Sequence, residues 1–278
     1  MEVIETIDAL RKARARFGQL GLVPTMGYLH EGHLSLVRLA RADCTATAAS
    51  IFVNPTQFSP HEDLSRYPRD LERDLSLLRA EGVDLVFVPS VAEMYPEDFA
   101  TYVEVGGVTE MLEGAARPVH FRGVATIVCK LFTIIQPDRA YFGQKDAQQT
   151  IVVRKMARDL NLPVEVVVGP TVREPDGLAM SSRNAYLTSE QREAAPVLYQ
   201  ALTTTQRRYA NGERDGEALR ATLRDVLASE PLAEPEYVSA ADPLTLRELD
   251  IIGSNGVLLS LAVRIGLTRL IDNILIET

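Results

Sequence analysis

The stretch LGLVPTMGYLHEGHLSLVRLARADCTATAASIFVN, residues 20–54, decides the fold class. Residues 20–24 are apolar and of strand length, and the apolar positions of residues 33–42 recur at helical spacing. Residues 46–54 form a second apolar run that is typical of a buried strand. A strand, a glycine-containing loop, a helix and another strand at this spacing indicate a parallel pair joined by a helical crossover.

The same alternation continues to about residue 170 and predicts a Rossmann-like α/β domain with a parallel sheet. The later part of residues 63–82 is expected to be helical and to end at Gly82. The further expected elements are a strand at 83–89, a loop containing 101–105, a helix at 123–135 ended by Pro137, a strand at 139–143, a helix at 147–160 and a strand at 163–169.

The pattern changes in the segment GPTVREPDG, near residues 170–175. Two helices are expected next, at 189–210 and 216–229, followed by strands at 236–243, 258–266 and 269–277, the last two close enough to pair antiparallel. We therefore expect a first domain over residues 1–173 and a smaller α+β domain over residues 174–278.

Composition and charge exclude several classes of protein. The 278 residues include 29 Lys and Arg against 38 Asp and Glu, a net charge of −9, with 46% hydrophobic residues. This acidic balance argues against nucleic-acid binding, which depends on many basic side chains. The two cysteines, Cys44 and Cys129, form no disulfide framework and no metal-type spacing. Because the chain has no apolar run of about 18 residues and no leader-like N-terminus, we expect a cytoplasmic protein without a membrane partner.

The loop after the first strand, PTMGYLHEGHLSLV (24–37), is the first candidate site. In parallel sheets ligands bind outside the carboxyl ends of the strands. His30 and His33 lie three residues apart, about 60° around a helix that begins near them. Gly27 and Gly32 let the backbone approach a ligand, and a helix N-terminus attracts anions. The combination predicts a triphosphate-binding loop.

Two other interpretations of the histidines remain open at this point. They could be ordinary surface or capping residues, as most isolated H-x-x-H pairs are. A zinc site is less favoured, because the H-E-x-x-H pattern is absent and no third ligand lies at a local spacing. We assign no residue as a metal ligand.

Two later segments favour the nucleotide interpretation. In FGQKDAQQ (142–149), Lys145 suits a phosphate, Asp146 accepts hydrogen bonds from ribose hydroxyls, and Gln149 follows one helical turn later. In GLAMSSRNAYL (177–187), two hydroxyls and a guanidinium follow a glycine, and they suit phosphoryl oxygens. The alternative for this second segment is a helix cap or a turn.

Seven motifs in order then resemble the pantothenate synthetase family of the nucleotidylyltransferase superfamily, which shares its core with class I aminoacyl-tRNA synthetases. They are PTMGYLHEGH, SIFVNPTQF, YPRDLERD, RPVHFRGV, YFGQKDAQQ, AMSSRN and RLIDNI. The resemblance implies a carbon–nitrogen ligase that joins (R)-pantoate to β-alanine through a pantoyl-adenylate, consuming ATP and releasing AMP and pyrophosphate. It also implies a homodimer and Mg²⁺ on the phosphates.

The resemblance assigns roles residue by residue. ATP contacts are expected from Met26, Gly27, Tyr28, Leu29, His30, Glu31, Gly32, His33, Gly143, Gln144, Lys145, Asp146, Val172, Met180, Ser181, Ser182 and Arg183. Charge stabilisation during catalysis is expected from His30, His33, Lys145, Ser181, Ser182 and Arg183. Pantoate is expected to contact Gln57 and Gln149. Further pocket candidates are Asn54, Tyr67, Asp74, Arg117 and His120.

Three positions depart from the family pattern. The family has Glu at the position of Gln144, an aromatic residue at Ala147 and Leu at Thr150. Gln144 removes a negative charge beside Lys145, and Ala147 leaves room for a packing space.

Rival functions are a tRNA synthetase, a different small-molecule adenylyltransferase and a nucleotide sensor that has lost turnover. The length and the acidic charge disfavour the first. Retention of both histidines, Lys145 and the M-S-S-R segment disfavours the sensor.

Overall fold

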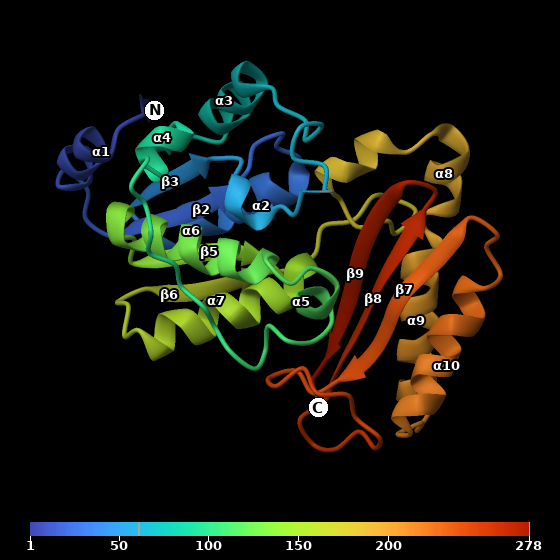
Figure 1. Cartoon of the computed structure of the whole chain (residues 1–278). Coiled ribbons are helices and arrows are strands. Elements are labelled where there is room, and N and C mark those ends of the chain that lie inside the picture. The colour runs from blue at the N-terminus through green and yellow to red at the C-terminus, as the bar shows by residue number, and fades with distance from the viewer. Residues whose placement is uncertain (61, 278) are drawn as a thin grey trace. The chain divides into compact units, whose positions relative to one another are not determined.

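The structure is a computed structural model that describes residues 1–60 and 62–277. The chain forms two compact units, both drawn in Figure 1. The first comprises Met1–Gln144 and Gln148–Pro170. The second comprises Lys145–Ala147 and the chain from Thr171 onward.

The first unit is built on a parallel sheet with the strand order β1-β4-β3-β2-β5-β6. The strands are β1 Glu2–Ile4, β2 Leu20–Thr25, β3 Ala46–Ile51, β4 Leu85–Phe87, β5 Arg139–Gly143 and β6 Glu165–Gly169. The predicted parallel sheet is confirmed. The strand expected at 46–54 ends at Ile51, and a short 3₁₀ helix, η1 Pro55–Gln57, follows. The short strand β1 at the sheet edge was not predicted.

Helices pack against this sheet with apolar side chains. On α2 (Glu31–Asp43) Leu36, Val37 and Ala40 are buried in one core with Leu78 of α3 (Leu71–Ala80) and the sheet residue Val23. Helix α6 (His120–Ile135) contributes Phe132, whose ring lies 6.3 Å from that of Phe142 on β5, and α1 (Ile7–Arg14) packs beside α6. The other helical elements of this unit are α4 Val91–Met94, α5 Glu113–Ala116, η2 Gln144–Asp146 and α7 Ala147–Asp159, the last two shared with the second unit.

Strands β2 and β5 form the topological switch point of the sheet. They are neighbours, but the chain leaves β2 towards β3 on one side and leaves β5 towards β6 on the other. Their carboxyl ends, Thr25 and Gly143, lie at the same sheet edge because the strands are parallel. Ligands of open α/β sheets bind at such a point, and the candidate segments at 26–33 and 144–146 follow directly.

The second unit is an antiparallel sheet with helices, as predicted. Its strands β7 Ala233–Ala241, β8 Val257–Ile265 and β9 Thr268–Ile276 lie in sequence order. Helices α9 (Val197–Ala210) and α10 (Gly216–Leu227) pack together beside this sheet, as Figure 1 shows, and share one apolar core with it.

One predicted helix was wrong. Residues 189–210 form two helices, α8 (Ser189–Ala194) and α9, with Pro196 at the start of the second. Proline has no backbone N–H and clashes with the preceding turn, so it cannot lie inside a continuous helix without a break.

Among the described residues, no helix is both long and apolar enough to span a bilayer.

Candidate functional site

The loop between β2 and α2 has an unusual backbone. Gly27 and Tyr28 have φ values of 84° and 51°, in the left-handed region, which costs about 1–2 kcal/mol for a residue with a side chain. The Asp74 carboxylate lies beneath the loop, 1% exposed, and accepts the backbone N–H groups of Tyr28 and Leu29 at 2.7 Å each. Burial raises the pKa of Asp74, and the two backbone hydrogen bonds oppose that rise. Asp74 therefore supports the loop conformation.

His30 and His33 cap helix α2 reciprocally. The Gly32 N–H donates to His30 Nδ1 at 3.2 Å, the His30 N–H donates to His33 Nδ1 at 3.3 Å, and the two ring centroids lie 4.1 Å apart. The capping interpretation of the histidines thus describes their geometry. It also determines which ring nitrogen carries the proton, because a neutral imidazole that accepts at Nδ1 is protonated at Nε2. The capping contacts use Nδ1 of each ring, so they are compatible with anion binding at the helix N-terminus.

The zinc alternative gains no support from the described residues. Within 1–60 and 62–277, no three His, Cys, Asp or Glu side chains come together as a metal site would require.

A pair of buried amides follows β3. Asn54 Nδ2 donates to Gln57 Oε1 at 3.0 Å, and Gln57 Nε2 contacts Met26 Sδ at 3.1 Å. Because its Oε1 accepts from Asn54, the orientation of the Gln57 amide is fixed. Asn54 also donates to the Gly123 carbonyl at 3.1 Å and accepts from the Tyr95 hydroxyl at 2.8 Å. Gly123 permits this packing, since a Cβ there would lie 2.4 Å from the Thr56 carbonyl oxygen.

His120 and Arg117 lie behind Gln57. Arg117 donates to the two Glu62 oxygens at 2.9 and 2.6 Å and lies 3.2 Å from His120 Nε2. Since a guanidinium only donates, His120 Nε2 accepts, and its Nδ1–H donates to the Gln57 carbonyl at 3.0 Å. Burial, and then the Arg117 charge, lower the pKa of His120 to about 4. His120 is therefore neutral at pH 7 and holds the Gln57 backbone.

Other predicted residues lie in the first unit. Tyr67 is buried with its ring edge-on to Phe58. Gly143 ends β5, and Gln144 and Gln149 are half-buried. Their neighbour Gln148 is fully engaged: it donates to the Val108 and Met111 carbonyls and accepts from the Glu113 N–H. Of the family departures, Ala147 and Thr150 are both buried.

The second unit carries Val172 and Met180–Arg183 on one hairpin and the segment after it. The Met180 N–H donates to the Val172 carbonyl at 3.0 Å, and Arg173 pairs with Ala179 in an antiparallel bridge. Ser181 caps the 3₁₀ helix η3 (Ser182–Tyr186) by accepting the Arg183 N–H at 3.3 Å. The cap alternative for this segment therefore also describes its geometry, while Ser182 is buried.

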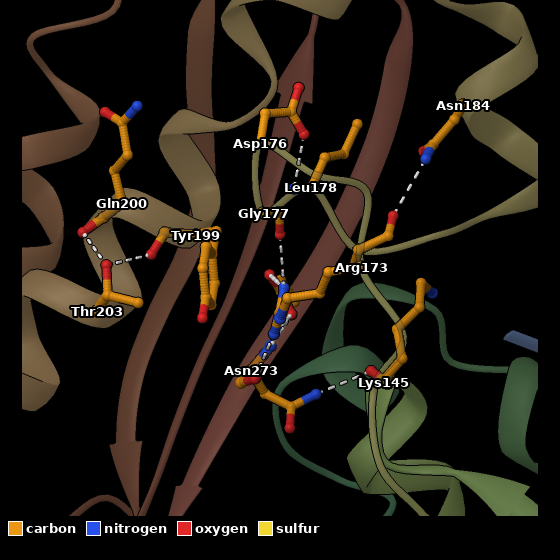
Figure 2. A network of polar contacts seen from close by, with 12 residues as sticks. Lys145, Arg173, Asp176, Gly177, Leu178, Asn184, Tyr199, Gln200, Thr203 and Asn273 are labelled. Atoms are coloured by element: carbon orange, nitrogen blue, oxygen red, sulfur yellow. Dashed lines mark hydrogen bonds and ion pairs between the residues drawn. The ribbon is translucent and has the colours of Figure 1, made fainter.

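Lys145 belongs to the second unit as well. Its Nζ lies 3.4 Å from Asp146 Oδ1, and its carbonyl accepts from Asn273 Nδ2 at 2.8 Å, as Figure 2 shows. Within the second unit the structure thus places Lys145 and Asp146 beside β9. Within the first unit it brings His30 next to His33, and Gln57 next to Met26 and Asn54.

Several supporting residues were not predicted. Glu62 pairs with Arg117, Tyr95 fixes Asn54, and Arg173 pairs with Asp272. The sequence does mark Asp272, because the motif RLIDNI places an aspartate at an alternating position that is otherwise apolar. Glu62 and Tyr95 lie in irregular segments, where no periodicity marks an inward position.

Comparison with known proteins matches this chain to one family. The family model described as pantoate-beta-alanine ligase matches residues 2–275. The pantothenate synthetase of Chloroflexus aggregans is 69% identical over 273 residues, which cover 98% of this chain and 99% of the relative. That of Roseiflexus castenholzii is 65% identical over 278 residues, with both chains fully covered.

Solved structures agree. The crystal structure of pantothenate synthetase from Thermus thermophilus has a TM-score of 0.96 at 50% identity, with both chains fully covered. The pantoate-beta-alanine ligase from Francisella tularensis, crystallised with βγ-ATP and β-alanine, has a TM-score of 0.81 at 33% identity and covers 99% of this chain and 97% of that one. From the family match and these relatives together, the chain belongs to the pantoate-β-alanine ligase family.

Proposed function

We propose that the residues described above carry out pantothenate formation in two steps. As a member of its family the chain is an ATP-dependent carbon–nitrogen ligase that joins pantoate to β-alanine. In the first step, pantoate and ATP give pantoyl-adenylate and pyrophosphate. In the second, β-alanine displaces AMP. The observation that carries the residue assignment is the capped His30–His33 pair at the N-terminus of α2, at the switch point of the sheet.

The first step needs charge stabilisation and no general base. The pantoate carboxylate is ionised at pH 7, because carboxyl pKa values lie near 4. Its oxygen forms the new bond to the α-phosphorus while the bond to pyrophosphate breaks, and negative charge develops on the phosphoryl oxygens. His30 and His33 donate to these oxygens through Nε2–H, and Lys145 adds a cation. Ser181, Ser182 and Arg183 stabilise the leaving pyrophosphate.

Pantoate is held by two amides in this proposal. Asn54 donates to Gln57 Oε1 and one Nε2–H of Gln57 is directed at Met26 Sδ, so in this proposal the second Nε2–H donates to an acceptor oxygen of the substrate. Gln149 binds pantoate from the other side. The amine of β-alanine then arrives unprotonated and attacks the acyl carbon, and the acyl–phosphate bond to AMP breaks. Positioning of the amine against the mixed anhydride carries this second step.

ATP contacts come from the loops that follow β2 and β5 and from the hairpin of the second unit. Besides the residues already given roles, the nucleotide contacts are Met26, Gly27, Tyr28, Leu29, Glu31, Gly32, Gly143, Gln144, Asp146, Val172 and Met180. Asp146 accepts from the ribose hydroxyls.

Magnesium would accompany the triphosphate and neutralise part of its charge. Since the described residues contain no cluster of three His, Cys, Asp or Glu side chains, phosphate oxygens and water would supply its ligands, which Mg²⁺ accepts readily.

The proposal gives residues 174–278 the role of a lid over residues 1–173, and Lys145–Ala147, which pack in the second unit, stay with the lid. An exposed adenylate hydrolyses, so the site must exclude water while the intermediate is present. Small-angle scattering with and without ATP tests this role, and identical profiles would remove it. We further propose a cytoplasmic homodimer, in line with the family resemblance, and light scattering measures its mass.

An AMP-release assay tests the function itself. Release must require pantoate and β-alanine together, with pantothenate formed in equal amount. A nucleotide sensor would be stabilised by ATP without releasing AMP. A different adenylyltransferase would not respond to pantoate.

A further inference from the structure

A carboxylate interrupts the apolar face of strand β9. Alternate residues of a strand share one face, and here they are Leu270, Asp272 and Ile274. Leu270 and Ile274 pack into the apolar core of the second unit, whereas Asp272 is 3% exposed among them. Burying a charged carboxylate destabilises the fold unless the carboxylate is paired. The partner of Asp272 therefore shows which segment is attached to the strand.

That partner is Arg173, 99 residues earlier in the chain. Its guanidinium donates to both Asp272 oxygens, at 2.6 and 3.0 Å, and to the Gly177 carbonyl at 3.1 Å, and it lies 4.1 Å from the ring centre of Tyr199. Arg173 and Gly177 belong to the hairpin that leads into Met180–Arg183. The ion pair therefore fixes this hairpin to β9, as Figure 2 shows.

The next residue on the strand holds a second segment. Asn273 projects to the opposite face from Asp272, because successive side chains of a strand alternate. Its Nδ2 donates to the Lys145 carbonyl at 2.8 Å, and its backbone N–H donates to Asp272 Oδ1 at 2.8 Å. Figure 2 shows the amide directed at Lys145, away from the Arg173 side. Two consecutive residues thus contact two segments that are far apart in sequence.

We propose that Asp272 and Asn273 are positioning residues, which hold Lys145 at a fixed separation from the Met180–Arg183 loop. Both segments contact the triphosphate in the proposed function, on which this inference rests. The strand between them sets their separation before ATP binds. Displacement of a phosphate contact by about 1 Å weakens its interaction with ATP, since contacts to phosphoryl groups depend on orientation.

The test replaces Asn273 by Leu, which has a similar shape and no donor. Losing one buried hydrogen bond typically corresponds to about a 3- to 10-fold change, and here we expect it in the KM for ATP. The KM for pantoate should change by less than about twofold, because the proposed pantoate contacts belong to the first unit. Asn273→Ala repeats the measurement in case the Leu side chain does not fit.

Ser260→Ala is the matched control. Ser260 lies opposite Asn273 in the β8–β9 register, is similarly buried, and its hydroxyl has no hydrogen-bond partner among the described residues. It should leave both KM values unchanged.

An unchanged KM for ATP in both Asn273 variants would overturn the inference. So would an equal loss for ATP and pantoate that follows a lowered melting temperature, which indicates a purely structural role. Lys145→Ala tests the proposed role of Lys145 separately from the positioning role of Asn273. If it too retains normal ATP kinetics, the proposed role of Lys145 fails, whereas a defect in Lys145→Ala alone rejects only the positioning role.

Discussion

Replacing Asp74 by Asn should release the loop that carries both histidines. The carboxylate accepts two backbone N–H groups at 2.7 Å, and hydrogen bonds to a charged group contribute about 1.5–3 kcal/mol each. Asparagine keeps one acceptor oxygen and turns its amide donor towards the other N–H. The left-handed residue Tyr28 then loses the interaction that offsets its conformational cost. We expect a loss of about 2–4 kcal/mol in the free energy of unfolding.

Thermal denaturation and ATP kinetics measure this effect together. A loss of this size lowers the melting temperature by about 5–10 °C in a protein of this length. The kcat/KM for ATP should fall by at least about tenfold. A tenfold fall corresponds to a loss of about 1.4 kcal/mol in transition-state stabilisation, which we expect when the histidines are displaced. Glu72→Gln, on the exposed first turn of the same helix, is the control and should change stability by less than about 0.5 kcal/mol. If Asp74→Asn matched this control in both measurements, the claim that Asp74 supports the loop would be wrong.

Three further substitutions test other parts of the site. His33→Ala should lower adenylate formation by a factor of about 10² or more, as for loss of one electrostatic contact, and near-normal turnover would reject its role. Gly123→Ala should cost about 1–3 kcal/mol and raise the KM for pantoate, because its Cβ would displace the segment of Gln57, whereas Gly106→Ala, with open space around it, should not. His120 stays neutral in the fold with a pKa of about 4, while the unfolded chain binds a proton near pH 6.5, so its stabilisation is present above pH 6.5 and lost towards pH 4. Urea denaturation at pH 7 and 4 should show a loss about 3 kcal/mol larger in the parent chain than in His120→Gln, and equal losses would contradict the buried neutral imidazole.

The architecture was largely predictable because its periodic signals are strong. Strands β2, β3, β5 and β6 and the helices between them match apolar runs of the expected length and period. The breaks were less visible. Pro196 splits a helix in a segment whose apolar spacing continues on both sides, and β1, at the sheet edge, is only three residues long with one buried residue.

The site was predictable where motifs place polar groups at the carboxyl ends of strands. His30 and Lys145 were predicted in this way, whereas Gln57 was predicted from the family resemblance, and all three roles stay predictions. Sequence spacing could not show that the histidines cap their own helix or that Asn54 fixes the Gln57 amide, because such contacts depend on side-chain rotamers. The aspartate of RLIDNI marks a buried carboxylate, but sequence spacing could not identify Arg173 as its partner, since the two residues are 99 positions apart.

The most direct test of the account is exchange of labelled pyrophosphate into ATP without β-alanine. If pantoate is adenylated in a separate first step, label enters ATP only when pantoate is present, and β-alanine is not required. Exchange that proceeds without pantoate would contradict the assigned substrate. Exchange that appears only after β-alanine is added would contradict the pantoyl-adenylate intermediate.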